Sequence, residues 1–150
     1  MHLDMKTAES ILTARLGTLP DAAEIAWATI WLEACGYSGV RLLGEALKDE
    51  HRTLDLARDA LGIDLHEVSC AFLAPAIMRE VHANGRAFLR NVRHGLYMLP
   101  FAVKENIGLG CPIDPSFAVG GERHKNPYGE KLAHAEAMGL EIDDALWAAI

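Results

Sequence analysis

The residues of this sequence that are best suited to chemistry lie in two short polar runs. The first contains Arg90, Asn91, Arg93 and His94 at the predicted end of a strand. Guanidinium groups can bind a carboxylate or phosphate bidentately, and an imidazole exchanges protons near neutral pH. Because strand ends are frequent ligand sites in α/β domains, this run predicts an anion site. The alternative is that both Arg residues pair with acidic helices and that His94 is a turn residue.

The second run follows the glycine pair at residues 120–121, which allows a close backbone approach, and leads into a predicted helix. Its candidate ligand-binding side chains are cationic, potentially cationic or phenolic: Arg123, His124, Lys125 and Tyr128. Free N–H groups at a helix N-terminus also favour an anion. The spacing matches neither the P-loop nor the G-x-G-x-x-G pattern, so it predicts no nucleotide site. The alternative is a solvated loop followed by a capped helix.

Charge distribution links the two runs. Residues 86–131 contain seven Lys or Arg and four Asp or Glu, a net charge of +3, whereas the whole chain has a net charge of −7. A basic segment in an acidic chain attracts anions, so we expect the two runs to bind a small anionic metabolite together. The overall negative charge argues against nucleic acid or an anionic membrane surface as a partner.

Other catalytic and metal-binding patterns are incomplete. The seven His residues contain no H-E-x-x-H pattern and the three Cys residues no C-x-x-C pair, while His66 and Cys70 would form only half a metal site. Neither Ser38 nor Ser116 lies in a G-x-S-x-G elbow. The sequence therefore predicts no metal and no cofactor, and it leaves open whether the protein is an enzyme.

The apolar pattern predicts the elements that must position these side chains. Helical spacing covers residues 6–16, 20–34, 39–50, 52–61 and 66–83, the last interrupted at Pro75. After Gly85 the period changes to two, which predicts a strand ending near Arg90, followed by an extended or short helical stretch over residues 96–103. Asn126-Pro127 predicts the start of another helix, and Asp143 the cap of a last one.

Length and composition predict one globular domain over residues 1–150, with 51% hydrophobic and 23% charged residues. We expect a helix-rich α+β (or α/β) fold with a small sheet after residue 85. Residues 108–129 contain five Gly and three Pro, which predicts a long loop. Because no signal-peptide h-region and no span-length apolar run is visible, we expect a cytoplasmic protein that does not bind membranes.

Two stretches resemble the malate/L-lactate dehydrogenase family whose signature includes a Ser-His-Gly motif. The first is residues 32–43, with a turn at Gly36 followed by Ser38-Gly39 and Val40-Arg41-Leu42. The second is residues 76–102, where a helix, Gly85 and a strand lead to the turn Arg90-Asn91-Val92-Arg93-His94. The resemblance covers about residues 25–107.

This resemblance implies that Arg90, Asn91 and His94 contact a ligand. The family's proposed acid/base histidine is absent, because Ser38 is followed directly by Gly39. The chain is also less than half the length of a family enzyme. The resemblance therefore implies a shortened relative that has lost hydride transfer.

A second hypothesis uses the basic segment differently. The protein would be an interaction or homodimerisation module without a small-molecule site, and the basic segment would dock on an acidic face of a partner or of a second copy. Salt-sensitive dimerisation would favour this hypothesis, whereas saturable ligand binding to a monomer would favour the first.

Overall fold

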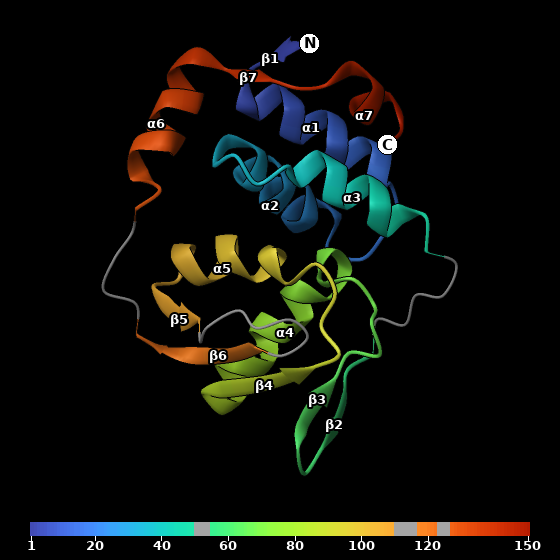
Figure 1. The fold of residues 1–150 in the computed structure, drawn as a ribbon, viewed down its shortest axis with the longest axis vertical. Coiled ribbons are helices and arrows are strands. Elements are labelled where there is room, and N and C mark those ends of the chain that lie inside the picture. Colours follow the sequence, from blue (N-terminus) through green and yellow to red (C-terminus); the bar gives the residue numbers. More distant parts are fainter. Residues whose placement is uncertain (50–54, 110–116, 123–126) are drawn as a thin grey trace. The chain divides into compact units, whose positions relative to one another are not determined.

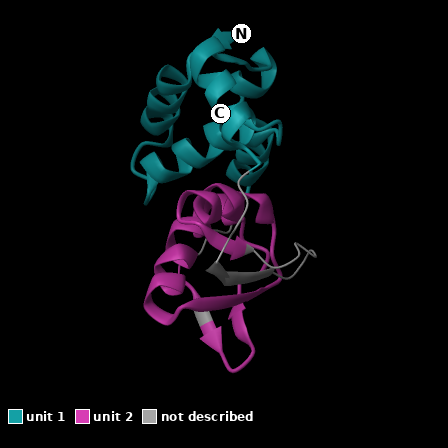
Figure 2. Ribbon diagram, turned by 90° about the vertical axis from the view of Figure 1, so that its left-hand side faces the viewer, with its two compact units in different colours: residues 1–49, 126–150 teal, residues 50–125 magenta. Residues whose placement is uncertain are grey.

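The computed structural model of the chain describes residues 1–49, 55–109, 117–122 and 127–150. Its contacts divide the chain into two compact units, which Figure 2 colours separately. Unit 1 comprises Met1–Asp49 and Asn126–Ile150, and unit 2 comprises Glu50–Lys125. The helix-rich α+β fold class is confirmed, whereas one globular domain over the whole chain stays a prediction.

Unit 1 is mainly helical. Its elements are α1 (Met5–Leu16), α2 (Ala22–Ala34), α3 (Gly39–Leu47), α6 (Gly129–Met138), α7 (Asp144–Ala148) and the antiparallel two-residue strands β1 (His2–Leu3) and β7 (Leu140–Glu141). Helix α2 is central, because it packs against α1, α3 and α6 and buries most of its residues. Asp4 and Asp143 cap α1 and α7 by accepting from the N–H groups of Thr7 and Leu146, both at 2.9 Å. The cap at Asp143 confirms the prediction from the sequence, whereas the cap at Asp4 was not predicted.

Unit 2 combines a mixed sheet with helices (Figure 1). Its elements are β2 (Ala57–Asp59), β3 (Gly62–Asp64), α4 (Cys70–Asn84), β4 (Arg86–Arg90), the 3-10 helix η1 (Gly95–Tyr97), α5 (Met98–Lys104), β5 (Ile107–Leu109) and β6 (Phe117–Glu122). The strand order is β2-β3-β4-β6-β5. Strands β3 and β4 are parallel and are connected through α4, whereas the other neighbours are antiparallel.

Strand β4 has the alternation that the sequence predicts. Ala87 and Leu89 are buried, and Phe88 on the opposite face is 49% exposed. Helix α4 packs against this strand. It begins at the cap Ser69, ends at the left-handed Gly85 and continues through Pro75 rather than splitting there.

The predicted helix over residues 52–61 is wrong in its described part, because β2 and β3 form a hairpin there. Asp59 accepts from the N–H of Leu61 at 2.8 Å in the turn. Gly62 has a φ of 121°, and a Cβ at this position would lie 2.3 Å from Phe88 O on β4. Only glycine fits so close to a neighbouring strand in this conformation. Pairing with β4 therefore overrides the local helical pattern, and the sheet begins before residue 85.

The predicted loop over residues 108–129 is also corrected. Part of it is strand β6, which lies between β4 and β5 and joins them into one sheet. Residues 110–116 and 123–126 lie outside the described part of the chain. Helix α6 begins at Gly129 with Tyr128 at the cap position, so Pro127 precedes the helix instead of opening it. Among the described residues, no helix has the length and apolarity needed to cross a membrane.

Candidate anion site at the ends of two parallel strands

The carboxyl ends of β3 and β4 lie beside the N-terminus of α4 in unit 2 (Figure 1). Asp64, the last residue of β3, pairs in register with Arg90, the last residue of β4. Beyond the strands, the backbone of residues 65–70 stays bonded to that of residues 90–93, for example from Cys70 N–H to Arg93 O at 2.9 Å. The polar residues gathered here form what we call the strand-end cluster: Asp64, Ser69, Asn91, Arg93 and His94. This topology places ligands at strand ends in many α/β proteins.

The backbone around the cluster is strained. Positive φ angles occur at His66 (49°), Glu67 (61°), Asn91 (52°) and His94 (55°), which are four of the seven such non-glycine residues in the described ranges. A left-handed conformation costs a residue with a side chain roughly 1–2 kcal/mol. Strain of this kind is concentrated at functional sites and must be held by surrounding bonds. One such bond runs from Glu67 N–H to Asn91 O at 3.0 Å.

A hydrogen bond between Ser69 and His94 fixes the imidazole. Ser69 is fully buried, and its Oγ accepts from Ala71 N–H at 3.1 Å and lies 2.7 Å from His94 Nδ1. The buried hydroxyl proton needs an acceptor, and Nδ1 is an atom within reach that can accept it. We therefore assign Nδ1 as the acceptor, so that neutral His94 carries its proton on Nε2. The contact with Ser69 therefore fixes the orientation of the ring.

Asn91 is held by a carboxylate. Its Nδ2 donates to Asp64 Oδ1 at 2.8 Å, and the N–H of His66 donates to the same oxygen at 2.9 Å. These two bonds, the one from Asn91 foremost, lower the pKa of Asp64 below its usual value. Asp64 therefore stays ionised and places a negative charge in the cluster. Asn91 therefore links the ends of β3 and β4, whether or not it also contacts a ligand.

Arg90 is engaged in an ion pair. Its Nη2 lies 2.6 Å from Asp59 Oδ2 on β2, and its side chain is 25% exposed. Its buried Nε has no hydrogen-bond partner among the described residues. Of the two hypotheses for Arg90, pairing with an acidic side chain agrees with this geometry, although the partner lies on a strand and not on a helix.

The N-terminus of α4 offers no free N–H group to an anion. Its first four N–H groups donate within the protein: Cys70 to Arg93 O (2.9 Å), Ala71 to Ser69 Oγ (3.1 Å), and Phe72 and Leu73 to Ser69 O (3.1 and 3.3 Å). The dipole of the helix still favours negative charge there. Besides Arg90, the strand-end turn carries the guanidinium group of Arg93 and the imidazole of His94, and both residues are half-buried.

Of the candidate residues in the second predicted run, the structure describes only Tyr128. Arg123, His124 and Lys125 lie outside the described residues. Tyr128 belongs to unit 1, whereas residues 90–94 belong to unit 2. The Tyr128 ring packs against Trp31 (centroids 5.0 Å apart) and Tyr37 (6.1 Å), and its hydroxyl lies 3.2 Å from that of Tyr37. These contacts give Tyr128 a packing role at the start of α6.

The two units differ in charge. Unit 1 contains twelve Asp or Glu and five Lys or Arg, a net charge of −7, whereas unit 2 contains nine of each and is neutral. The basic segment is therefore balanced by acidic residues elsewhere in unit 2. The strand-end cluster has the same balance, because it combines Arg93 with the ionised Asp64.

Sequence reasoning missed Ser69 and Asp64. The available signal for Ser69 was a cap-type residue directly before the apolar run of α4. Asp64 was not recognised because it lies on β3, and the local sequence pattern did not predict the β2–β3 hairpin.

No family model matches the chain, and no curated protein and no solved structure matches it either. The resemblance to the dehydrogenase family therefore stays a prediction. Within the described ranges, no group of three His, Cys, Asp or Glu residues is placed to hold a metal ion.

Proposed function

We propose that the protein binds a small anionic metabolite at the strand-end cluster. Arg93 supplies the guanidinium group and His94 the imidazole. The observation that carries this proposal is the 2.7 Å contact between Ser69 Oγ and His94 Nδ1. A ring held at Nδ1 has less freedom to lose when a ligand binds, which favours affinity.

The charge of the cluster favours a singly charged ligand. Asp64 stays ionised, and Glu67 is a second carboxylate on the same turn. A ligand with several negative charges would be repelled by both, whereas a monocarboxylate could pair with Arg93 at one end. We therefore expect monocarboxylates to bind more tightly than phosphorylated metabolites or nicotinamide dinucleotides.

A thermal-shift screen tests the proposal. Purified protein is titrated with monocarboxylates, phosphorylated metabolites and nicotinamide dinucleotides, and each titration is repeated with Arg93→Ala and His94→Asn. Asn tolerates the left-handed backbone at position 94. A ligand at about 100 times its Kd should stabilise the native protein by about 2.7 kcal/mol.

Arg86→Ala is the matched control, because Arg86 is an exposed arginine at the opposite end of the same strand. A saturable shift that disappears in Arg93→Ala and remains in Arg86→Ala supports the proposal. Equal effects of the two substitutions would show that only general charge matters and would refute the site.

A homodimerisation module is the second candidate function. It is favoured by Phe88, which is 49% exposed in the middle of β4, and by the contrast between the net charge of −7 on unit 1 and a neutral unit 2. Sedimentation velocity at low and high salt tests it. A dimer that dissociates with salt and with Phe88→Ser supports the module, and a monomer at all salt concentrations excludes it.

A further inference from the structure

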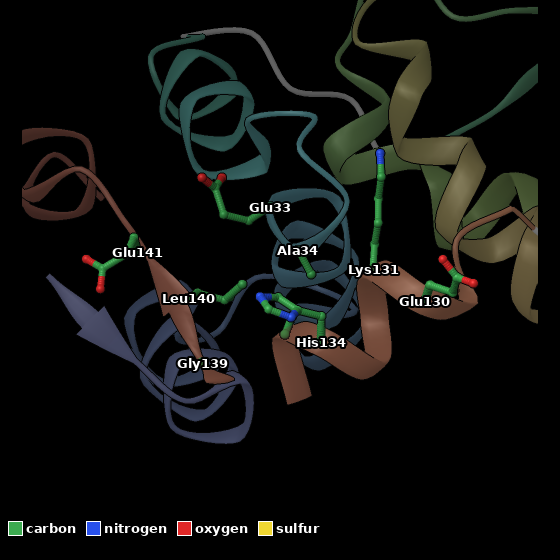
Figure 3. Close-up of a pocket in the computed structure, with 9 residues that line it drawn as sticks. Glu33, Ala34, Glu130, Lys131, His134, Gly139, Leu140 and Glu141 are labelled. Carbon is green, nitrogen blue, oxygen red and sulfur yellow. The ribbon is translucent and has the colours of Figure 1, made fainter. Parts of the chain in front are cut away.

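Unit 1 contains a hollow of about 630 Å³ beside α6, but its charged side chains do not converge on one point (Figure 3). Glu130 and Glu141 turn away from the hollow, and Glu141 Oε1 already lies 2.7 Å from Nδ1 of the His2 ring. Ligand recognition needs polar groups that face the same place. Unit 2 gives a sharper indication, because a buried donor of Arg90 has no acceptor there among the described residues.

Arg90 and Asp59 meet across the strand that lies between them. Arg90 ends β4 and Asp59 ends β2, and β3 separates these two strands in the sheet. Gly62 on β3 is the register partner of Asp59 and, being glycine, places no side chain between them. Asp64, the register partner of Arg90, is instead bonded to Asn91 Nδ2 at 2.8 Å. Arg90 Nη2 therefore donates to Asp59 Oδ2 at 2.6 Å.

This ion pair uses the Arg90 guanidinium group incompletely. An arginine side chain can present Nε and Nη2 side by side to the two oxygens of one carboxylate. Asp59 engages only Nη2, and its other oxygen, Oδ1, accepts from Leu61 N–H at 2.8 Å in the hairpin turn. The buried Nε is left without a hydrogen-bond partner in the described part of the chain. Because a buried donor without an acceptor costs stability, a carboxylate that bonded to both nitrogens would be favoured over Asp59.

We propose that Arg90 binds the carboxylate of the ligand and that Asp59 occupies this position in the free protein as an internal competitor. This role of Arg90 rests on the proposed function, the binding of a monocarboxylate at the strand ends, and adds Arg90 to Arg93 as a guanidinium group of that site. The ligand carboxylate accepts from Nε and Nη2 together. Asp59 is 54% exposed, so its carboxylate can turn into solvent when it is displaced.

Competition by Asp59 predicts that the affinity increases when its charge is removed. Asp59→Asn keeps an oxygen that can accept from Leu61 N–H, so the hairpin turn is retained. Sodium acetate is titrated at constant ionic strength, and binding is followed by the chemical shift of the Arg90 Nε–H group, which is assigned by its absence in Arg90→Gln. We expect a saturable shift in the wild type and an affinity higher by about two- to fivefold in Asp59→Asn, the equivalent of one exposed ion pair. An unchanged or lower affinity in Asp59→Asn would overturn the proposal.

The same substitution in an Arg90→Gln background separates competition from general charge. Removing a carboxylate favours any anion slightly, whether or not Arg90 takes part. Binding is followed here by the backbone amides of Arg93 and His94. We expect Arg90→Gln to weaken acetate binding by about tenfold and to abolish the gain from Asp59→Asn. An equal gain in both backgrounds would refute the role of Asp59.

Glu80→Gln is the matched control, since it removes a different ion pair of the hairpin. Arg58 Nη2 lies 2.8 Å from Glu80 Oε2, and this pair joins β2 to α4. Glu80→Gln should leave the acetate affinity unchanged. A rise as large as that in Asp59→Asn would mean that a loosened hairpin, and not the release of Arg90, admits the ligand, and it would contradict the proposal.

Arg93→Ala separates this proposal from the proposed function. If Arg93→Ala loses acetate binding while Asp59→Asn binds acetate as the wild type does, the anion site stands and the competition by Asp59 is refuted. If neither the wild type nor Asp59→Asn shows saturable acetate binding, both are refuted.

Discussion

At the scale of single residues, Ser69 has two roles: it caps helix α4, and it holds the ring of His94. Its Oγ accepts from Ala71 N–H at the start of α4 and lies 2.7 Å from His94 Nδ1. We expect Ser69→Ala to lower the free energy of unfolding by about 1–2 kcal/mol, because a cap is lost and the imidazole loses its partner. Urea unfolding measures this change.

Ser38 provides the control for that measurement. It occupies the cap position of α3 but makes no side-chain cap hydrogen bond. Ser38→Ala should therefore change the stability by less than about 0.5 kcal/mol. A loss as large as that of Ser69→Ala would mean that the Ser69 contacts contribute nothing specific.

Asp64 makes the stability depend on pH. Its pKa in the folded protein is lowered from 3.8, foremost by the hydrogen bond from Asn91 and then by the His66 N–H. Below 3.8 the unfolded state binds the proton more readily, so the stabilisation is present above this pH and is lost as the pH falls through the lower folded pKa. Asp64→Asn should flatten this part of the profile of urea midpoint against pH. A profile as steep as that of the wild type would exclude Asp64 as its source.

At the scale of elements, the β2–β3 hairpin depends on Gly62. A Cβ there would lie 2.3 Å from Phe88 O, and the φ of 121° is unfavourable for other residues. Gly62→Ala should destabilise unit 2 by about 2 kcal/mol or more. Gly44 in α3 has open space where a Cβ would lie, so Gly44→Ala should instead stabilise by about 0.5–1 kcal/mol. Thermal unfolding of both variants checks the contrast, and equal effects would contradict it.

Local signals account for the elements that the sequence predicts well. Helices α1, α2 and α3 and strand β4 follow from apolar spacing and from stops such as Gly17 and Gly85. The β2–β3 hairpin and β6 could not be predicted in this way, because each owes its conformation to pairing with a strand distant in sequence. The site shows the same division. Arg93 and His94 were visible as a polar run, whereas the partners Ser69 and Asp64 are brought to them only by the parallel pairing of β3 and β4.

At the scale of the whole molecule, the tryptophan residues and the excess of negative charge both belong to unit 1. Trp27, Trp31 and Trp147 all belong to unit 1, which has a net charge of −7. Tryptophan emission therefore follows the unfolding of unit 1, whereas far-UV circular dichroism follows both units. Coincident transitions would support one cooperative domain, as the sequence predicts, and separate transitions would show that the units unfold independently.

Salt should stabilise unit 1 by screening its own repulsion. Raising the ionic strength to about 0.5 M shortens the Debye length to a few ångströms, so we expect the fluorescence-detected urea midpoint to rise by the equivalent of about 1 kcal/mol. Glu136→Lys, which replaces an exposed acid on α6, should raise the midpoint at low salt and reduce its salt dependence, because it makes the net charge of unit 1 less negative. If salt leaves the urea midpoint of the wild type unchanged, and Glu136→Lys has the same midpoint as the wild type, then nearby positive charges already balance the acidic side chains of unit 1.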